Sequence, residues 1–577
     1  MDRRTTILLA AAAGAVFMTA FEVLRPVFSL GSIGFTTSQL AAILFIAAFA
    51  LWAGKSRAGL RGRGALDAAV VLFVASNFLS AAFAADTPGA LKFSLRMTLA
   101  ALVYFGISRL PARAPSHQVV AGSAAAALLV VSLVGLLEYF VSFADWARLL
   151  SPWQEDSFVF GAFYNIRISS TLPYPTSLAM FIELTLPLLT ASGLWLIALK
   201  PASDTRRRLL MAALAAAMAA AVAVLIFTYT RSSLAALPLS MITGAAAALV
   251  YGYGKRTAAF FLLAAALMVS ILGVSTIFSD RTAARLGVAE PAQRFSAEYQ
   301  ILEFPADLRP GEESRTRLKI SNTSDVTWIP AGEGRVLASY RWFENGRQTG
   351  ETSVDSSLPR DIRPGEEFEL EVRLLAPREP GSYVVAIELL QAGVGWFSDT
   401  HVRPAMVAVE IDWEGSRTLP LSEEETRFIW SVDETSTAPR AALWRAAARM
   451  WADHFLLGVG PGQFRTAHAE YLSGYDPDER LEAHNIILSA AANTGLIGVA
   501  AMLYLLAGAA WAQLRMVRDR ALAPDRRLLA LGLLAALVAY VSHGMLDYFL
   551  WQTGIALMFF AQLGLTSWLY YDRNSGT

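Results

Sequence analysis

Two polar residues, one that can transfer a proton and one that can form hydrogen bonds, stand directly before a long apolar run: His484 and Asn485, followed by Gly495 and Gly498. Imidazole and amide groups gain nothing from contact with hydrocarbon, so their position indicates a functional site at a membrane surface. Histidine is the side chain that most often acts as a general base in enzymes. The pattern predicts that His484 is a base and that Asn485 orients either the imidazole or a substrate.

Three arginines offer the positive charge that binds phosphate groups: Arg231 and Arg440, with Arg167 in support. A guanidinium can hold two phosphate oxygens at once, which a lysine ammonium cannot do. The alternatives are that Arg440 is a solvated arginine on a charged helix, and that the histidine at the membrane boundary is an interfacial residue. His454 and His468 lack carboxylate ligands at metal spacing, so we expect no metal and no cofactor.

The elements that must position these residues are long apolar runs. Hydrophobic residues make up 55% of the 577 residues and charged residues 17%, which indicates a polytopic α-helical membrane protein. A helix needs about 20 apolar residues to span a bilayer. We predict about twelve such spans, at 6–24, 37–54, 66–84, 90–108, 118–140, 174–198, 208–229, 233–252, 257–277, 485–512, 527–546 and 549–571. The first resembles a signal peptide but has no clear cleavage site, so we expect it to remain as a helix.

Basic residues occupy every second connection between these spans. Short loops rich in Lys and Arg stay in the cytoplasm, so both termini are predicted to be cytoplasmic. The outer connections then include 141–173 and the long segment 278–484, and His484 faces the periplasm of a bacterial inner membrane. Arg231 also lies at the outer end of its span, against the general trend, which favours a function for it.

The outer segment contains a stretch with a different pattern, from 298 to 412. Apolar and polar residues alternate there with period two, as in 316–320, 368–374 and 383–389, and Pro-Gly pairs separate the runs. This pattern predicts an antiparallel β-sandwich resembling immunoglobulin-like or fibronectin-like modules, with Trp328, Trp342 and Trp396 in its core. The chain has no cysteine, so packing alone must hold such a domain together. It is either a spacer or a contact surface for a glycan or another envelope protein.

A glycine-rich turn, Gly458 to Phe464, lies in the amphipathic segment 436–484 that follows. No Lys-Ser or Lys-Thr pair follows it and no βαβ context surrounds it, so it is not a nucleotide-binding loop. We expect no nucleic-acid partner. The predicted order along the chain is spans one to nine (1–277), the sandwich (298–412), the amphipathic segment (436–484) and spans ten to twelve (485–577).

Together these motifs resemble the family of O-antigen ligases and O-antigen polymerases. The C-terminal part of the resemblance consists of Arg440 with Trp444, the Gly458 to Phe464 turn, and the spacing His-Asn-x9-Gly-x2-Gly that begins at His484. Upstream, Thr230-Arg231-Ser232 is similar to a Ser-Arg-Gly element of the family, and 167–175 is similar to its Arg-x-Ser-Gly-Thr-Phe region. The chain departs from the family at Ser170, where Gly is usual, and at Asn493, where Glu is frequent.

The resemblance implies a GT-C-like membrane fold and a metal-independent, inverting glycosyltransferase. Such an enzyme would move a glycan from an undecaprenyl-diphosphate carrier to an acceptor hydroxyl on the periplasmic side. The acceptor would be lipid A core for a ligase, another lipid-linked repeat for a polymerase, or a protein for an oligosaccharyltransferase, and we expect the ligase type. The predicted catalytic residues are His484, Arg231 and Arg440, and the predicted substrate-binding residues are Arg167, Asn485 and Asn493.

Two other classes of function remain open. A transporter of lipid-linked saccharides would use the arginines to bind diphosphate without bond formation, but it would be expected to show an internal repeat and charges deep in its spans. A sensor would need far fewer spans for anchoring. His543 and Asp547, four residues apart, are expected to form an interfacial pair with each other, and the alternative is that they join the site. Lys92 and Arg96 at the start of the fourth span are further candidates for contact with phosphate.

Overall fold

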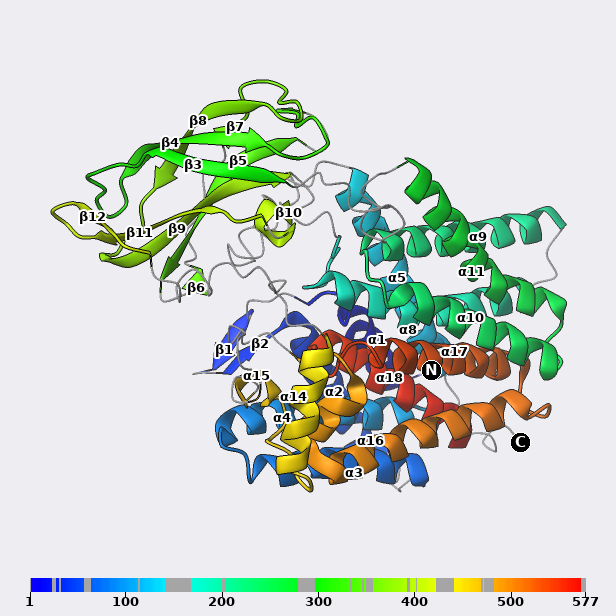
Figure 1. The fold of residues 1–577 in the computed structure, drawn as a ribbon. Coiled ribbons are helices and arrows are strands. Elements are labelled where there is room, and N and C mark those ends of the chain that lie inside the picture. The colour runs from blue at the N-terminus through cyan, green and yellow to red at the C-terminus, as the bar shows by residue number, and fades with distance from the viewer. Residues whose placement is uncertain are drawn as a thin grey trace. The chain divides into compact units, whose positions relative to one another are not determined.

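The chain divides into a helical unit and a β-unit, which are described here one at a time (Figure 1). The helical unit comprises Met1–Ser142, Arg167–Val274 and Arg440–Thr577. The computed structural model describes residues 2–22, 27–30, 33–56, 64–112, 115–140, 168–199, 204–278, 296–331, 335–344, 347–348, 356–391, 395–400, 402–421, 440–467, 471 and 482–571.

Each of the twelve predicted spans corresponds to a helix. These helices are α1 (Arg3–Met18), α2 (Thr37–Ser56), α3 (Ala65–Ala81), α4 (Thr87–Ser108), α5 (Ser116–Phe140), α8 (Pro175–Leu199), α9 (Asp204–Phe227), α10 (Ser233–Val250), α11 (Lys255–Phe278), α16 (Ile486–Arg518), α17 (Pro524–Gly544) and α18 (Thr553–Tyr571). Within the described ranges, ten are long and apolar enough to cross a membrane. The other two, α1 and α3, have 16 and 17 residues. The prediction of a multi-pass membrane protein is confirmed, and the span count of twelve stays a prediction.

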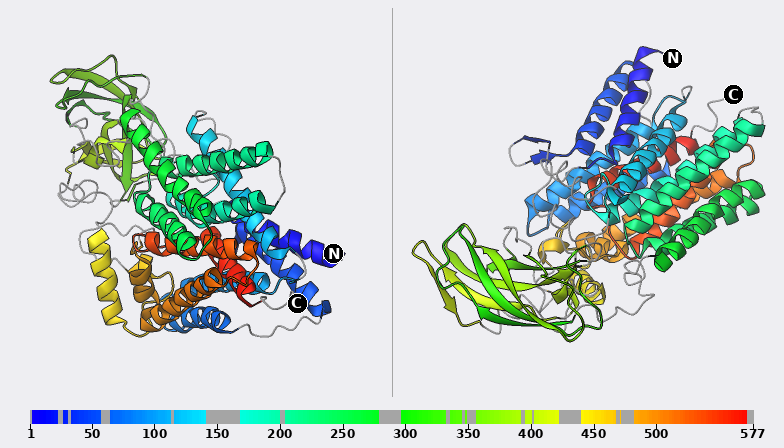
Figure 2. Two further views of the ribbon diagram at one scale, coloured as in Figure 1. Left: turned by 90° about the vertical axis from the view of Figure 1, so that its right-hand side faces the viewer. Right: turned by 90° about the horizontal axis from the view of Figure 1, so that it is seen from above.

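The burial of the helices differs according to their neighbours. The apolar window of α18 is 94% buried and that of α2 is 17% buried, although both are long and apolar. α18 packs against α4, α16 and α8, and α17 packs against α8, α10 and α16 (Figure 2). The C-terminal helices therefore form the interior of the unit, and the connection between α17 and α18 is held by several helices at once.

Helix α16 is broken at Gly495, whose φ of 64° and ψ of −164° are not helical. A turn that follows α14 (Arg440–Asp453) fills the break, because the Leu496 amide donates to the Phe455 carbonyl at 2.8 Å. The Val459 amide likewise donates to the Ala492 carbonyl at 2.8 Å. A Cβ on Gly495 would lie 2.3 Å from a backbone carbon of Leu456. This glycine thus permits a helix break and the approach of a turn.

The predicted turn from Gly458 to Phe464 is the segment that packs on this break. The Gly460 amide donates to the Asn493 carbonyl at 2.9 Å, and the Ser80 hydroxyl of α3 donates to the same carbonyl at 2.9 Å. The short helix α15 (Phe464–Ala467) follows the turn. An N-terminal hairpin, β1 (Phe28–Leu30) and β2 (Ile33–Phe35), completes the described elements of this unit.

The β-unit consists of two antiparallel sheets. One has the strand order β3 (Ala297–Glu303), β4 (Glu313–Asn322) and β8 (Glu367–Leu375). The other has the order β12 (Ser416–Leu419), β11 (Ala405–Ile411), β9 (Gly381–Gln391), β5 (Val336–Glu344) and β6 (Arg347–Gln348), with β10 (Gly395–Trp396) paired to β9 and β7 (Ser356–Ser357) paired to β5. Buried side chains from both sheets belong to one hydrophobic cluster. The three alternating runs of the sequence are therefore strands β4, β8 and β9.

The aromatic core of the β-unit differs from the prediction at one residue. Trp328 and Trp342 are buried as expected, but Trp396 is partly exposed and its ring lies 4.6 Å from the Arg341 guanidinium. Phe397, the next residue, is fully buried and packs edge-on against Trp328 at 5.4 Å. β10 ends at Trp396 and a 3-10 turn begins at Phe397, so the side chain that enters the core is that of Phe397.

Candidate functional site

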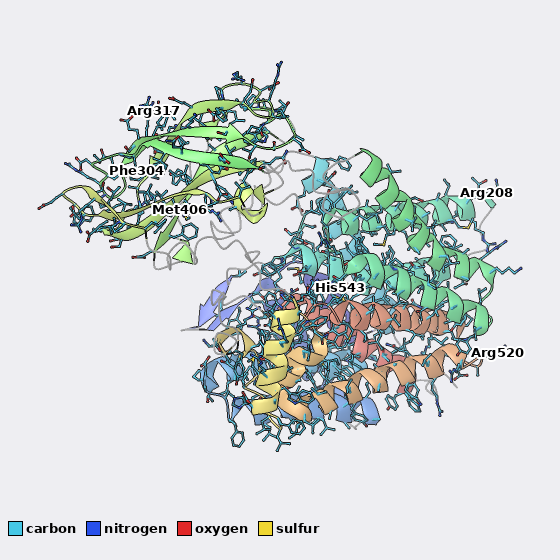
Figure 3. The ribbon with its side chains drawn as sticks, in the orientation of Figure 1. Arg208, Phe304, Arg317, Met406, Arg520 and His543 are labelled. Carbon is cyan, nitrogen blue, oxygen red and sulfur yellow. The ribbon has the colours of Figure 1, made fainter. Side chains whose placement is uncertain are left out.

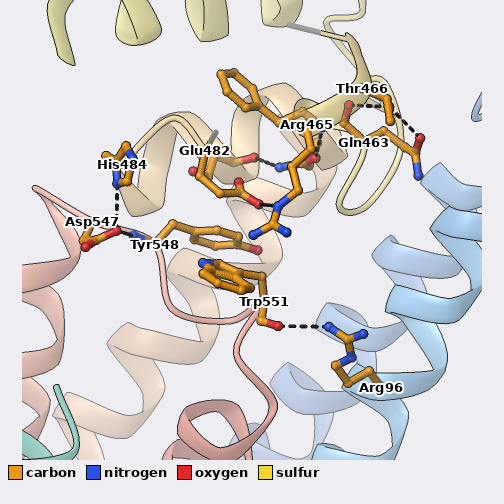
Figure 4. A network of polar contacts seen from close by, with 12 residues as sticks. Arg96, Gln463, Arg465, Thr466, Glu482, His484, Asp547, Tyr548 and Trp551 are labelled. Atoms are coloured by element: carbon orange, nitrogen blue, oxygen red, sulfur yellow. Dashed lines mark hydrogen bonds and ion pairs between the residues drawn. The ribbon is translucent and has the colours of Figure 1, made fainter. Parts of the chain in front are cut away.

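His484 lies two residues before the first residue of α16, outside the apolar helix, and its side chain is 33% exposed. Its Nδ1 is 2.9 Å from Oδ1 of Asp547, which lies in the connection between α17 and α18 (Figure 4). The same oxygen accepts the Tyr548 amide at 2.8 Å. The carboxylate thus holds the imidazole from one side and is itself held by the backbone.

The charge state of Asp547 determines which nitrogen of His484 is available. Burial alone would raise the pKa of Asp547, but the hydrogen bond and charge of His484, the charge of His543 and the Tyr548 amide outweigh it and lower that pKa. An ionised carboxylate accepts a proton donor, so we assign the hydrogen of the neutral ring to Nδ1. Nε2 then carries a lone pair and can accept a proton from a hydroxyl group, as a catalytic base does.

Arg231 lies in the connection between α9 and α10, and its side chain is exposed. The adjacent Ser232 hydroxyl is 2.6 Å from Nε2 of His543, and Nδ1 of His543 is 2.8 Å from Oε2 of Glu183 in α8. His543 and Glu183 are fully buried, and His543 lies near the end of α17 (Figure 3). Because His543 and Asp547 are four residues apart, this chain of contacts ties the Arg231 connection to the segment that holds His484.

Arg440 is the first residue of α14 and is exposed. The opposite face of α14, formed by Leu443, Ala447 and Met450 with neighbouring alanines, is buried where the helix packs against α16. The Arg440 guanidinium is near enough to His543 for its positive charge to act on that imidazole. Arg440 therefore belongs to the same end of the helical unit as His484.

The segment that follows Arg167 begins at Ile168, whose amide donates to the Phe227 carbonyl at 3.3 Å. The Glu138 carboxylate in α5 accepts the amides of Ser169 and Ser170 at 3.2 and 2.6 Å. These contacts place the segment beside the end of α9, close in the chain to Arg231. Arg167 itself lies outside the described residues.

Asn485 and Asn493 have side-chain contacts that fix α16. The Asn485 side-chain oxygen accepts two backbone amides of the first helical turn at 3.0 Å, and its Nδ2 donates to the Met545 carbonyl at 2.9 Å. Asn493 is buried; it donates to the Ser489 carbonyl at 2.8 Å and accepts the Phe464 amide at 3.0 Å. These bonds support orientation of the helix that follows His484, and a contact of either amide with substrate stays a prediction.

Backbone strain occurs in three places: after Arg167, before Arg231 and at His484. Among the described residues, the non-glycine residues with positive φ are Ser170 at 55°, Tyr229 at 50° and His484 at 46°. Such conformations cost about 1–3 kcal/mol each and persist where the surroundings enforce them, which is frequent at functional sites. Ser170 and Tyr229 lie within three residues of Arg167 and Arg231, and the third strained residue is His484 itself, so each adjoins or is a predicted site residue.

Comparison with known proteins gives a family match for one part of the chain. Residues 382–503 match the family model described as O-antigen ligase. This part of the chain is similar to the O-antigen ligase family. The match includes Arg440, the Gly458 to Phe464 turn and His484, and it begins within strand β9. It does not extend to the segments around Arg167 and Arg231, whose resemblance to the family stays a prediction.

Other comparisons add no functional information on this protein. None of the curated proteins matches it significantly. The solved structure of the alkylpurine DNA glycosylase AlkC of Pseudomonas fluorescens, bound to DNA containing an abasic site analog, covers 61% of this chain and 98% of its own. Its sequence identity of 11% and TM-score of 0.18 are too low to support any inference.

The sequence did not predict which residues His543 and Asp547 contact. The expected interfacial pair between them is wrong, because both His543 nitrogens contact Glu183 and Ser232, and Asp547 contacts His484. One signal was present: Glu183 is a carboxylate inside an apolar span, which is costly unless it has a partner. The spacing of four residues between His543 and Asp547 favoured a local pair and gave no indication of their long-range partners.

The described part of the chain contains no group of three or more His, Cys, Asp or Glu residues that could hold a metal ion. The polar groups of the candidate site are the carboxylate–imidazole pair of Asp547 and His484, the buried His543 imidazole, and the exposed Arg231 and Arg440. This set can accept a proton and can bind an anion. These are the two operations that transfer of a group from a phosphate ester to a hydroxyl requires.

Proposed function

We propose that the protein is a metal-independent, inverting membrane glycosyltransferase of the ligase type, acting on the periplasmic face of the bacterial inner membrane. Its donor is a glycan on undecaprenyl diphosphate, and its acceptor is a hydroxyl group of lipid A core. The Asp547–His484 pair, in a chain whose residues 382–503 match the O-antigen ligase family model, carries this proposal.

In the proposed reaction, Nε2 of His484 takes the proton of the acceptor hydroxyl. The hydroxyl oxygen forms a bond to the anomeric carbon of the donor sugar from the side opposite the carrier. The bond between that carbon and the diphosphate oxygen breaks, and the electron pair leaves with undecaprenyl diphosphate. Arg231 and Arg440, with Arg167, bind the diphosphate and stabilise its developing charge, because guanidinium groups form charge-assisted bonds to phosphate.

The topology supports the proposed side of the membrane. Arg208 and Arg520 lie toward one end of the helical unit and His543 lies away from that end (Figure 3). The positive-inside trend assigns the arginine-rich end to the cytoplasm and the His484 end to the periplasm. The proposal therefore places both termini in the cytoplasm.

A transfer assay with the full chain in lipid nanodiscs tests the proposal. The donor is a purified undecaprenyl-diphosphate-linked glycan and the acceptor is lipopolysaccharide that lacks O-antigen. His484→Ala should lower the rate by about 10²- to 10⁴-fold, the usual contribution of a general base. His454→Ala, which alters an exposed histidine after α14, is the matched control and should retain the rate. Full transfer by the His484 variant would exclude the base role.

The acceptor and the arginines need separate arms of this assay. Product on a second lipid-linked repeat or on a protein, and none on lipopolysaccharide, would replace the ligase by a polymerase or an oligosaccharyltransferase. Movement of donor across the bilayer without any product would favour a transporter. Arg231→Lys and Arg440→Lys should raise the donor KM, whereas Arg445→Lys on an exposed part of α14 should not. Contact of the β-unit with glycan or an envelope protein is a further part of the proposal, tested by removal of 298–412.

A further inference from the structure

A second group of charged and aromatic side chains adjoins His484. Arg465 of α15 donates through Nε to Oε1 of Glu482 at 2.8 Å, and its guanidinium lies over the Trp551 ring at 4.2 Å (Figure 4). Tyr174 lies beside Trp551, with ring centroids 5.5 Å apart. We call Arg465, Glu482 and Trp551 the Arg465 cluster. The proton transfer proposed above uses none of these residues.

The cluster has hydrogen-bonding capacity that the described residues do not use. Nη2 of Arg465 and Oε2 of Glu482 are both buried, and neither has a hydrogen-bond partner among the residues that the structure describes. Glu482 is 2% exposed. A buried donor or acceptor of this kind is costly unless water or a ligand meets it. Here one donor and one acceptor belong to the same ion pair, so a single hydroxyl group could accept from Arg465 and donate to Glu482.

The chemistry of the cluster favours a sugar over a phosphate. A phosphate would meet Arg465 but would also face the Glu482 carboxylate, which already balances that positive charge. A sugar presents hydroxyl groups that donate and accept, together with an apolar ring face. The partly exposed rings of Trp551 and Tyr174 offer apolar surface for such a face.

The position of the cluster indicates which sugar it would bind. Glu482 precedes His484 by two residues, and the charges of His484 and Asp547 act on it. The contact between Arg231 and the proposed diphosphate lies on a different connection, between α9 and α10. A sugar held by Glu482 would therefore be the one whose hydroxyl group reaches the base.

We propose that Arg465, Glu482 and Trp551 form a subsite for the acceptor sugar, in which Glu482 and Arg465 share one sugar hydroxyl and Trp551 contacts the ring. This inference rests on the proposed function, since it assigns the acceptor side of that reaction. Arg96 donates to the Trp551 carbonyl at 2.9 Å and holds the backbone of the subsite in place.

Saturation-transfer NMR tests the subsite without requiring catalysis. The probe is the soluble core oligosaccharide released from lipopolysaccharide that lacks O-antigen, added to the full chain in nanodiscs. The wild-type protein and His484→Ala should both bind it. Glu482→Gln and Trp551→Leu should each weaken binding by about tenfold or more, the effect of one charged hydrogen bond or one buried aromatic contact. Trp511→Leu is the matched control, because Trp511 lies under Arg515 at 4.6 Å near the other end of α16.

Each outcome separates the subsite from the proposed function. Binding that depends on Glu482 and Trp551 without any transfer would support the subsite and oppose the glycosyltransferase. Transfer by the wild type with unchanged binding in both variants would show that the cluster holds only water and would overturn the subsite. Displacement of the oligosaccharide by inorganic phosphate would overturn it in favour of an anion site. Arg465→Lys keeps the charge and provides a second variant if Trp551→Leu fails to fold.

In the transfer assay the same variants give a kinetic check. Glu482→Gln should raise the KM for lipopolysaccharide about tenfold and leave the donor KM within about twofold. A rise in the donor KM alone would assign the cluster to the donor side and overturn the inference. A general loss of stability would lower the amount of active protein and leave both KM values unchanged.

Discussion

Replacement of Asp547 by Asn tests the carboxylate–imidazole pair most directly. The substitution keeps the shape of the side chain but removes the charge that His484 contacts at 2.9 Å. An amide can also present its NH₂ group to Nδ1, which would place the ring hydrogen on Nε2 and remove the lone pair needed by the base. We expect slower transfer with a nearly unchanged KM for the donor.

The structure sets the size of this effect. A hydrogen bond between charged groups contributes about 1.5–3 kcal/mol, which corresponds to about 10- to 160-fold in rate. Asp547 is nearly buried, but His484 is one third exposed, so solvent weakens the pair. The lower part of the range, about 10- to 30-fold, is therefore expected for Asp547→Asn.

The chain contains a matched control for this substitution. Asp525 of α17 contacts His117 of α5 at 2.8 Å, at the opposite end of the helix that precedes Asp547. Asp525→Asn removes the same kind of pair and should cost stability without a comparable loss of transfer. Both variants are compared in nanodiscs by initial rates of product formation and by thermal unfolding.

A double variant gives the decisive measurement. If Asp547 acts through His484, Asp547→Asn should have almost no further effect in a His484→Ala background, because the two residues work as one unit. Independent, multiplicative losses would refute the reasoning. A rate for Asp547→Asn equal to that of Asp525→Asn would refute it as well.

Three further predictions concern stability. Gly495→Ala should prevent accumulation of folded protein, because its Cβ would lie 2.3 Å from a backbone carbon of Leu456, whereas Gly508→Ala, with 3.6 Å to its nearest neighbour, should be tolerated, as judged by size-exclusion chromatography. Asn485→Ala should cost about 0.5–2 kcal/mol through loss of the helix N-cap, measured by thermal unfolding. Burial raises the pKa of Glu482, so its contribution to stability is present below the unfolded value of about 4.3 and is lost as pH rises through the folded pKa. The Tm of wild type relative to that of Glu482→Gln should therefore fall from pH 5 to pH 8, and a rise would contradict this assignment.

The sequence predicts helices well in this chain and predicts their contacts poorly. Apolar runs of the right length correspond to α2, α4 and the other spans, because hydropathy alone determines which segments enter a membrane. The short lengths of α1 and α3 were not predictable, since the apolar composition continues past the last helical residue of each. Burial of α18, in contrast to α2, depends on which helices surround it, and hydropathy does not predict it, because the mean hydropathy is 1.2 for the buried α18 and 1.7 for the exposed α2.

The polar contacts of the candidate site were the least predictable part. His543 and Asp547 have the spacing of a local helical pair, yet their partners come from residues 360, 311 and 63 positions away in sequence. Of these partners, Glu183 stands out in its own segment, as a carboxylate inside an apolar span. Only the packing of α8, α10 and α16 around α17 brings them together, and a single sequence carries no direct record of that packing.

Ser170 shows how backbone shape can persist where the residue type departs from a family pattern. The family resemblance calls for Gly at this position, and the backbone of Ser170 has a φ of 55°, a conformation that glycine adopts without strain. Two contacts hold the serine there: its amide donates to Glu138 at 2.6 Å, and its hydroxyl donates to the Val131 carbonyl at 2.8 Å. These two hydrogen bonds offset the cost of the left-handed conformation. A glycine could form only the one from its amide. The departure from the family pattern at Ser170 therefore leaves the left-handed backbone of the segment after Arg167 in place.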